Sequence, residues 1–338
     1  MRTAMVTKPF TVEIVEKPVP KYGPDDVLIK VKVAGVCGSD LQLYRGTHPF
    51  RQPPAVLGHE VAGDVIAVGS NVTKLQVGNR VAVLPHIECG TCEFCQADMQ
   101  NLCVNKTVPG TPKWEGTFAE YFSAPEAKTY KIADGVSYEM GALVEPLAVA
   151  VHAVSRVLSD KRGSIAILGC GTIGLLTLMV AKEFGYKRIY CTDTAPFNNE
   201  MALKCGANMA LNPLETDAVE AFLKDNGGGM DVTFVAAGSP DIINHASRLT
   251  KRLGEIVLIS MITKDIPVYT YGFVYNEQTL RGAMTYRNAD YEKAMELING
   301  GLDLSMFVTQ NLPLSEAGSA LEMLNNKSGD IIKIMINM

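Results

Sequence analysis

Short apolar runs separated by turn-forming residues make up the first part of the chain, to about residue 124. Valine, isoleucine and leucine alternate with polar residues inside the runs, and Gly, Pro or Asn lie between them. This pattern is typical of a compact unit built mostly from β-strands. The strands are expected at residues 11–17, 26–36, 59–69 and 78–85.

The pattern changes between about residues 160 and 286. Apolar, β-branched runs now alternate with segments of helical periodicity, and this alternation predicts a parallel sheet with helices on its faces. The runs lie at 164–168, 188–193, 231–238 and 255–260, and the clearest helical segments at 172–185 and 200–207. The remaining residues could belong to either unit and add predicted helices at 291–301 and 314–324 and a closing strand at 331–337.

Composition narrows the class of protein. The 338 residues suit about two domains, and an apolar content of 47% is typical of packed cores rather than disorder. The formal net charge is −5 with no block of like charges, so nucleic acid and anionic membranes are not expected as partners. Residues 1–10 lack the apolar core of a secretory signal. We therefore expect a cytoplasmic protein whose eight cysteines stay reduced.

A glycine-rich segment directly follows the predicted strand at 164–168 and opens the next helix. Such a turn lets a pyrophosphate approach the backbone at a helix N-terminus. Asp193 ends the following strand 19 residues after the last glycine, where a carboxylate binds the ribose hydroxyls of NAD and repels the 2′-phosphate of NADP. A plain glycine turn with a surface aspartate is the alternative. The predicted cofactor-binding residues are Gly169, Gly171, Thr172, Ile173, Gly174 and Asp193.

Half of the cysteines lie within fifteen residues, at Cys89, Cys92, Cys95 and Cys103. Four thiolates on one short segment satisfy a closed tetrahedral zinc site, which serves structure because no coordination position stays open. Disulfides are the competing interpretation, but a reducing compartment and the two-residue spacings argue against them. We predict a structural zinc here.

Four other residues with metal-binding side chains are dispersed: Cys37, His59, Glu60 and Glu145. Spacing alone does not join them. A lone cysteine in a β-rich unit is usually a small buried hydrophobe, and a lone histidine is more often a hydrogen-bonded polar residue than a ligand. Glu145 could equally cap a helix.

The order of these motifs resembles one known family over essentially the whole chain. A Gly-x-Cys-Gly-Ser-Asp segment around Cys37 precedes Gly58-His59-Glu60, the four cysteines, Glu145-Pro146 and the glycine-rich turn. This order resembles the zinc-dependent medium-chain dehydrogenase/reductase family, and within it the sorbitol, threonine and sugar-acid dehydrogenases. The resemblance implies a GroES-like β-rich catalytic domain at 1–150, completed by about 287–338, and a Rossmann domain with a doubly wound parallel sheet that binds NAD at 151–286.

The resemblance also assigns the dispersed ligands. Cys37, His59 and a glutamate would hold a catalytic zinc, which with the four-cysteine site gives two zinc ions per chain. Relatives use the residue at Glu60 or the one at Glu145, so both stay open as the third ligand.

Three residues close to Cys37 follow from the same resemblance. Ser39 would take the proton of the substrate hydroxyl, and Asp40 would lie behind the metal ligands. Many relatives carry a histidine five residues after the zinc cysteine, whereas this chain has Gln42. Glutamine cannot ionise, so the outward proton path must use another group.

The implied activity is hydride transfer between NAD and a secondary alcohol of a polyol, sugar or sugar acid. A zinc ion would act as a Lewis acid on the hydroxyl. Relatives form dimers or tetramers, so a homo-oligomer is expected. Polar residues that would suit such a substrate are Tyr44, Arg45, His48, Trp114, Glu115, Arg287 and Asn288.

Other functions remain as alternatives. A threonine or simple secondary-alcohol dehydrogenase has the same motifs, whereas a zinc-free reductase would lack the dispersed ligands. A non-enzymatic zinc-binding regulatory protein is the alternative from another class. The four-cysteine segment 88–103 has acidic residues and no basic one, which is a poor surface for nucleic acid.

Overall fold

The computed structural model describes residues 1–160 and 162–338, which form two compact units. The β unit comprises Met1–Glu145 and Arg287–Met338, and the α/β unit comprises Pro146–Tyr286. The chain passes from one to the other within helix α4 (Val144–Ser155). No helix of the described residues is long and apolar enough to cross a membrane.

The β unit contains a mixed sheet in the order β15-β16-β3-β5-β6-β8, with β7 also paired to β3, and a smaller sheet β2-β1-β4. Its helices are α1 (Gly38–Tyr44), α2 (Glu93–Gln96), α3 (Tyr138–Ala142), α10 (Asn288–Asn299) and α11 (Ala317–Asn326), with 3-10 turns η1 (Gln100–Leu102), η2 (Glu126–Lys128), η3 (Ser305–Phe307) and η4 (Leu314–Glu316). Its strands are β1 (Arg2–Lys8), β2 (Thr11–Glu16), β3 (Asp26–Gly35), β4 (Ala55–Val56), β5 (Glu60–Val68), β6 (Arg80–Val83), β7 (Tyr121–Pro125), β8 (Thr129–Lys131), β15 (Val308–Pro313) and β16 (Lys333–Asn337).

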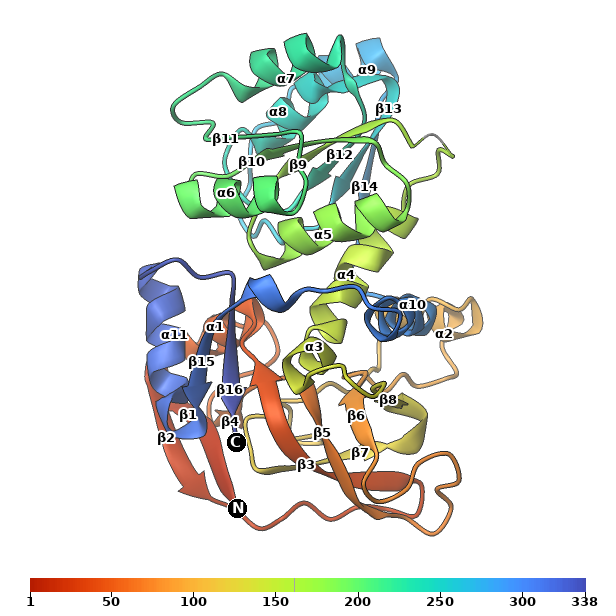
Figure 1. Cartoon of the computed structure of the whole chain (residues 1–338), viewed down its shortest axis with the longest axis vertical. Coiled ribbons are helices and arrows are strands. Elements are labelled where there is room, and N and C mark those ends of the chain that lie inside the picture. Colours follow the sequence, from red (N-terminus) through yellow and green to blue (C-terminus); the bar gives the residue numbers. More distant parts are fainter. Residues whose placement is uncertain (161) are drawn as a thin grey trace. The chain divides into compact units, whose positions relative to one another are not determined.

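The alternation of inward-facing and outward-facing side chains along β3 explains the main core of the β unit. Val27, Ile29 and Val31 point to one side and pack with Val61 and Val65 of β5. Each of these side chains is almost completely buried, and burial of one such side chain is worth about 1.5–3 kcal/mol. The last strand, β16, lies between β15 and β3, so the C-terminal segment completes a sheet that residues 26–131 begin (Figure 1).

The α/β unit has a parallel sheet in the order β11-β10-β9-β12-β13-β14, which is the doubly wound order 3-2-1-4-5-6. Helices α5 and α6 lie on one face of this sheet, and α7 and α8 lie on the other (Figure 1). The helices are α5 (Thr172–Glu183), α6 (Pro196–Lys204), α7 (Ala218–Asn226), α8 (Ile242–Leu249) and α9 (Thr270–Asn276). The strands are β9 (Ser164–Leu168), β10 (Arg188–Thr192), β11 (Met209–Leu211), β12 (Met230–Val235), β13 (Thr250–Leu258) and β14 (Thr279–Gly282).

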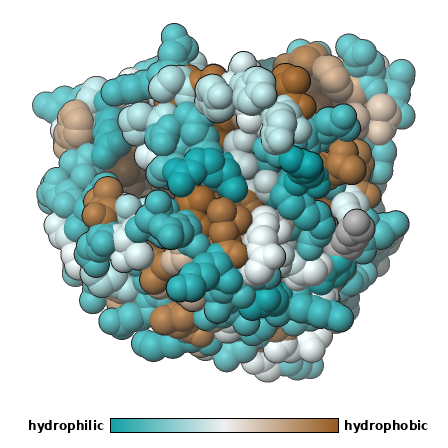
Figure 2. Space-filling view, turned by 90° about the horizontal axis from the view of Figure 1, so that it is seen from above, coloured by the Kyte–Doolittle hydropathy of each residue, from teal (hydrophilic) through white to brown (hydrophobic). Residues whose placement is uncertain are grey.

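The predicted fold class, a GroES-like β-rich domain with a doubly wound parallel sheet, is confirmed. In the α/β unit, helices α7, α8 and α9 and strands β11 and β14 were not among the expected elements. On the face shown in Figure 2, apolar side chains are exposed in several groups among polar ones. Exposed apolar residues of the α/β unit include Tyr269, Tyr271, Val274, Tyr275 and Leu280.

Candidate active site

The ends of two paired strands bring three of the dispersed residues together. Cys37 follows the end of β3 and precedes α1, while Glu60 opens β5 directly opposite Gly35. One potential ligand atom each from Cys37, His59 and Glu60 lies within 4.8 Å of the others. A thiolate, an imidazole and a carboxylate form a donor set that suits zinc.

The surroundings of His59 fit a cation at this cluster. Its Nδ1 atom is buried and has no hydrogen-bond partner among the described residues, and the Asp40 carboxylate lies 3.7 Å away. Burial lowers the pKa of His59, but the charges of Cys37 and Asp40 more than offset this, so the pKa is raised well above its usual value. The cluster is therefore a place of negative potential, and its residues fit a zinc ion.

Asp40 ties the two ligand-bearing segments together. It is fully buried, and its carboxylate accepts hydrogen bonds from the backbone N–H of Cys37 (3.0 Å) and of Gly58 (3.1 Å). Burial favours the protonated acid, but His59 and Arg51 together lower the pKa of Asp40 to about 2. Asp40 thus stays charged and holds Cys37 and Gly58 in place on either side of the cluster.

A buried arginine and a second histidine lie next to Asp40. Arg51 is 6% exposed, and its guanidinium approaches Asp40 to 4.0 Å and the His48 ring nitrogen Nε2 to 3.1 Å. Burial and the positive charge of Arg51 lower the pKa of His48 to about 4. His48 is therefore neutral near pH 7 and supports Arg51. Arg51 was not among the residues expected at this site.

A buried lysine accompanies Glu60, and the sequence analysis did not identify it. The Lys333 ammonium donates to both carboxylate oxygens of Glu60, at 2.7 and 2.8 Å, and to the carbonyl of Val36 at 3.1 Å. Burial lowers the pKa of Lys333, but the charges of Glu60, Cys37 and Glu145 raise it above its usual value overall. The available signal was a single lysine inside the apolar run at 331–337.

The other predicted residues of this site occupy different positions. Glu145 is buried in the first turn of α4 and does not belong to the cluster of ligand atoms found among the described residues. Ser39 and Gln42 are half-buried on α1, two and five residues after Cys37. Their catalytic roles stay predictions.

The four remaining predicted ligands form a second cluster. One sulfur atom each from Cys89, Cys92, Cys95 and Cys103 lies within 4.8 Å of the others. The Sγ atoms of Cys92 and Cys95 are 3.5 Å apart and those of Cys89 and Cys95 are 3.9 Å apart. Sulfur atoms about 2.3 Å from a tetrahedral zinc are separated by roughly 3.8 Å, whereas a disulfide needs about 2.05 Å. The spacing therefore suits a metal, and all four thiols are free.

The glycine-rich turn has the geometry of a pyrophosphate site. Gly169 adopts a φ of +102°, and a Cβ on Gly174 would lie 1.8 Å from the Gly169 carbonyl oxygen. Nothing lies within 4 Å of a Cβ built on Gly171, so this glycine leaves open space beside the N-terminus of α5. Thr172 and Ile173 form the first turn of that helix. A phosphate can reach the backbone N–H groups there.

Asp193 closes the same turn. Its carboxylate accepts hydrogen bonds from the backbone N–H of Cys170 at 2.7 Å and of Ala195 at 2.9 Å. Both oxygens retain lone pairs, because a carboxylate has about four acceptor positions. Asp193 is therefore fixed at the end of β10 and can still accept from ribose hydroxyls.

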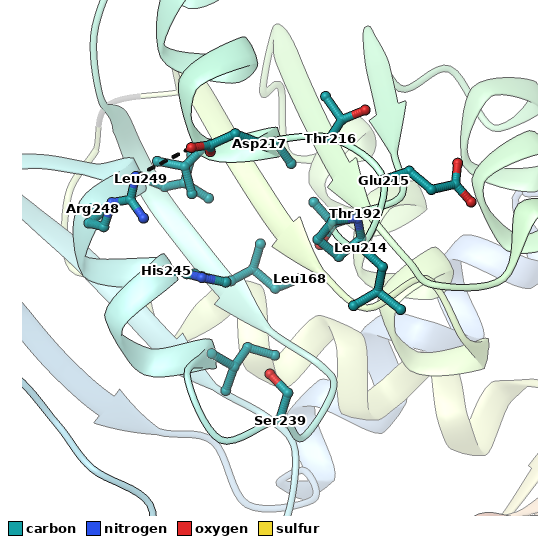
Figure 3. Close-up of a pocket in the computed structure, with 14 residues that line it drawn as sticks. Leu168, Thr192, Leu214, Glu215, Thr216, Asp217, Ser239, His245, Arg248 and Leu249 are labelled. Carbon is teal, nitrogen blue, oxygen red and sulfur yellow. Dashed lines mark ion pairs between the residues drawn. The ribbon is translucent and has the colours of Figure 1, made fainter.

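A pocket of about 460 Å³ opens at the carboxyl ends of the parallel strands. Figure 3 shows Leu168 and Thr192 on one wall and His245 and Arg248 from α8 on another, with Arg248 3.8 Å from Asp217. Ligands of doubly wound sheets bind at this edge, near the point where the strand order reverses. The lining residues, which the sequence analysis missed, are Leu168, Thr192, Pro213, Leu214, Glu215, Thr216, Asp217, Ala218, Val219, Ser239, Ile242, His245, Arg248 and Leu249.

The residues expected near a substrate already have partners within the protein. Asn288 donates to Glu88 at 3.1 Å, and Arg287 caps its own helix through Asp290. Contact with a substrate stays a prediction for each of them. The other pairs are Tyr44 with Phe10, Arg45 with Asn325, His48 with Arg51, Trp114 with Phe122 and Glu115 with Lys17.

Comparison with known families covers both units. Residues 23–134 match the alcohol dehydrogenase GroES-like domain, and residues 172–300 match the zinc-binding dehydrogenase domain. Sorbitol dehydrogenase of Bacillus subtilis is 35% identical over 99% of this chain and 97% of its own. L-threonine 3-dehydrogenase of Caldanaerobacter subterraneus is 32% identical, with 95% of this chain and 94% of the relative covered.

Solved structures with bound nucleotides are also similar. A zinc-binding dehydrogenase from Sinorhizobium meliloti bound to NADP has a TM-score of 0.94 and 28% identity, with 100% of this chain and 99% of that chain covered. An alcohol dehydrogenase from Escherichia coli in complex with NADH has a TM-score of 0.92 and 27% identity, with the same coverage.

Proposed function

Because this chain belongs to the zinc-dependent medium-chain dehydrogenase/reductase family, we propose that it oxidises a secondary alcohol of a polyol, sugar or sugar acid with NAD. It is a zinc-dependent NAD(P) dehydrogenase of the polyol and threonine branch. The observation that supports the proposal is the cluster of Cys37, His59 and Glu60, in which the buried Nδ1 atom of His59 has no hydrogen-bond partner among the described residues.

Some residues at the cluster would bind a metal, and others would transfer a proton. Cys37 and His59 would hold the catalytic zinc with a glutamate, and Asp40 fixes both segments through the backbone N–H groups of Cys37 and Gly58. When bound, zinc is a Lewis acid that can lower the pKa of a bound water from about 15.7 to roughly 7, and NAD accepts the hydride. Ser39 accepts the proton of the substrate hydroxyl. Gln42 cannot continue the path, so the proton leaves through water or a cofactor hydroxyl.

The second zinc and the nucleotide have separate sites. Cys89, Cys92, Cys95 and Cys103 hold the structural zinc, since four thiolates close its coordination. Free thiols at this site require a reducing compartment, which supports a cytoplasmic location.

The glycine-rich turn and Asp193 would hold the pyrophosphate and the ribose of NAD, and the pocket beside Thr192 offers room for its adenine (Figure 3). Asp193 supports NAD over NADP, because a 2′-phosphate would meet a fixed carboxylate.

A homo-dimer or homo-tetramer is part of the proposal. Strand β14 is an edge of the parallel sheet, so one row of its backbone groups is left for another strand. The exposed apolar residues Tyr271, Val274 and Leu280 on α9 and β14 suit a second copy of the chain. Sedimentation of Val274→Asp beside the unaltered protein tests this, and loss of the oligomer is expected.

The test of activity is NAD reduction with a panel of polyols, aldonates, hexuronates, threonine and simple secondary alcohols. Activity on the first three classes, lost on chelation and restored by zinc, is the expected result. Activity on threonine or a simple alcohol alone would replace the substrate class and keep the mechanism. A zinc-loaded protein that is inactive on every substrate would contradict the proposed activity and favour a regulatory zinc-binding role.

A further inference from the structure

A cavity of about 310 Å³ in the β unit has no part in the proposed function. It lies between strand β2, the end of α1 and the start of α11, and α11 lies beside β2 in Figure 1. None of its lining residues belongs to a cysteine cluster or to the glycine-rich turn. A Cβ added to Gly318 would lie 3.5 Å from the Cβ of Val12, so this glycine lets α11 approach β2 closely beside the cavity.

Phe10 places an aromatic ring at this cavity in an unfavourable backbone conformation. It follows Pro9 in the turn between β1 and β2 and has a φ of +62°, a value at which Gly or Asn is usual. Its backbone N–H donates to the carbonyl of Tyr44 at 2.7 Å, and the residue stays 57% exposed. Neither burial nor backbone preference explains a phenylalanine here. Backbone strain of this kind is concentrated at binding sites.

The polar groups around this ring have no partners within the protein. Among the residues that the structure describes, the Tyr44 hydroxyl, the Glu322 carboxylate and the Ser319 hydroxyl form no hydrogen bond or ion pair. Burial first of all raises the pKa of Tyr44, and the negative charge of Glu322 raises it further, so the carboxylate lies near the phenol. Arg45 donates instead to Asn325 at 2.8 Å and does not line the cavity. The charge of Glu322 is therefore not neutralised by an ion pair.

The chemistry of the lining matches a cation that carries a carbon chain. Carboxylate, phenol and serine oxygens are all acceptors, and an ammonium group has three donors and no acceptor. The rings of Phe10 and Tyr44 lie at 76° to each other with centroids 5.4 Å apart, and aromatic rings attract cations. Val12 and Ile14 add apolar surface for the chain. A divalent metal ion fits poorly, because it takes about six oxygen ligands and the lining has one carboxylate.

We propose that this cavity binds a small aliphatic primary amine as its ammonium ion. The ammonium group lies between Glu322 and the hydroxyl of Tyr44, and the carbon chain lies against Phe10 and Ile14. The site uses neither a zinc ion nor the nucleotide. Its test therefore succeeds or fails independently of the proposed dehydrogenase activity.

Saturation-transfer NMR with butylammonium and the full chain measures the binding, with butanol and butyrate as probes of equal chain length. We expect transfer to butylammonium and little to the other two, because only the ammonium ion supplies both the charge and three donors. Glu322→Gln should weaken binding about tenfold, since a hydrogen bond to a charged acceptor is lost. The matched control is Glu13→Gln, which removes an exposed carboxylate of β2 that does not line the cavity. It should leave the affinity unchanged.

Phe10→Gly tests the aromatic part of the site. We expect binding to weaken on the order of threefold, which corresponds to the loss of one cation–π contact. The melting temperature should not fall, because glycine relieves the left-handed conformation and thereby offsets the lost contact with Tyr44. Loss of binding without loss of stability would distinguish a ligand site from a packing contact.

Four results would overturn the inference. They are absence of transfer to butylammonium in the unaltered protein, equal transfer to butanol, unchanged affinity in Glu322→Gln, and unchanged affinity in Phe10→Gly. A capped lysine, Nα-acetyl-lysine methylamide, distinguishes a free amine from a lysine side chain of another protein. Weaker binding of the capped lysine than of butylammonium is expected, and tighter binding would replace the free amine by a protein ligand.

Discussion

The two ligand clusters of the β unit are built in opposite ways. The four cysteines lie within fifteen residues of sequence, around the short helix α2. The Cys37 cluster joins residues from β3, β5 and, through Lys333, the last strand of the chain. A local cluster needs only its own segment to fold, whereas the dispersed cluster needs the strand register of a whole sheet. In the proposed function, the local cluster holds a metal that supports structure and the dispersed cluster holds one that supports chemistry.

The electrostatic surroundings of the two clusters also differ. In the four-cysteine cluster, backbone N–H groups lower the pKa of Cys89 to about 6, while burial and the neighbouring thiol of Cys92 raise that of Cys95 to about 12. The close spacing of the four thiols therefore opposes the ionisation of all of them together, and a bound cation would remove this opposition. The Cys37 cluster instead combines a thiol, an imidazole and a buried carboxylate, with a buried ammonium group beside them. Such a mixed set can leave one coordination position for a substrate.

The largest expected effect is the loss of activity in Cys37→Ser. Removal of the thiolate weakens the catalytic zinc, and several kcal/mol of Lewis-acid stabilisation correspond to a decrease of about a thousandfold or more in kcat. Steady-state kinetics and zinc analysis should show activity and one zinc lost together. Cys205→Ala, a buried cysteine outside both clusters, is the control and should keep both metals.

Cys92→Ser should have its main effect on stability. We expect loss of the other zinc and a fall in melting temperature of about 10 °C, which corresponds to roughly 3–5 kcal/mol at about 2–4 °C per kcal/mol. Calorimetry and metal analysis provide the measurement. A variant that keeps both zinc ions and its melting temperature would show that the four-cysteine cluster does not support stability through a bound zinc.

A substitution outside both clusters sharpens the comparison. Asp193→Ser removes the carboxylate at the end of β10, so kcat/KM for NAD should fall by about tenfold to a hundredfold, which is roughly 1.4–2.8 kcal/mol. Activity with NADP should rise because the repulsion is removed. Kinetics with both cofactors measure the effect, and the zinc content should stay at the value of the unaltered protein. An unchanged preference for NAD would be evidence against this role of Asp193.

The smallest effect concerns acid stability near each cluster. His48 lies beside Asp40 and Arg51, and His86 lies 3.2 Å from Asn288, three residues before Cys89 in the sequence. Burial first of all lowers the pKa of each histidine to about 4. Between about pH 6.5 and pH 4 the unfolded chain binds these protons and the folded protein does not. The free energy of unfolding should therefore fall as the pH falls, by up to about 1.4 kcal/mol per pH unit for each histidine.

Denaturant titrations of His48→Asn and His86→Asn across this pH range measure the slope. Each variant should lose the contribution of one histidine. Equal slopes in the variants and the unaltered protein would mean that the two histidines take up protons in the folded state as readily as in the unfolded chain.

Local patterns predicted the β-rich unit, the parallel sheet with its helices and the four-cysteine cluster, whereas the GroES-like domain and the Cys37 cluster followed from the resemblance to the family. The run at 164–168 followed by the glycine turn corresponds to β9 and α5, and the closing run at 331–337 contains β16. The contact between Lys333 and Glu60 could not be predicted, because it depends on which strands are neighbours and in what register. Arg51 was missed for the same reason, since only tertiary structure brings it to Asp40.

The position of β16 also has a consequence for the order in which the protein can form during synthesis. Residues 146–286 are continuous, so the α/β unit can fold while the C-terminal segment is still inside the ribosome. The sheet of the β unit cannot be completed until the last residues have emerged, because β16 fills the place between β15 and β3. Lys333 lies on β16, so the cluster of Cys37, His59 and Glu60 gains this buried lysine only after residues 333–337 have left the ribosome.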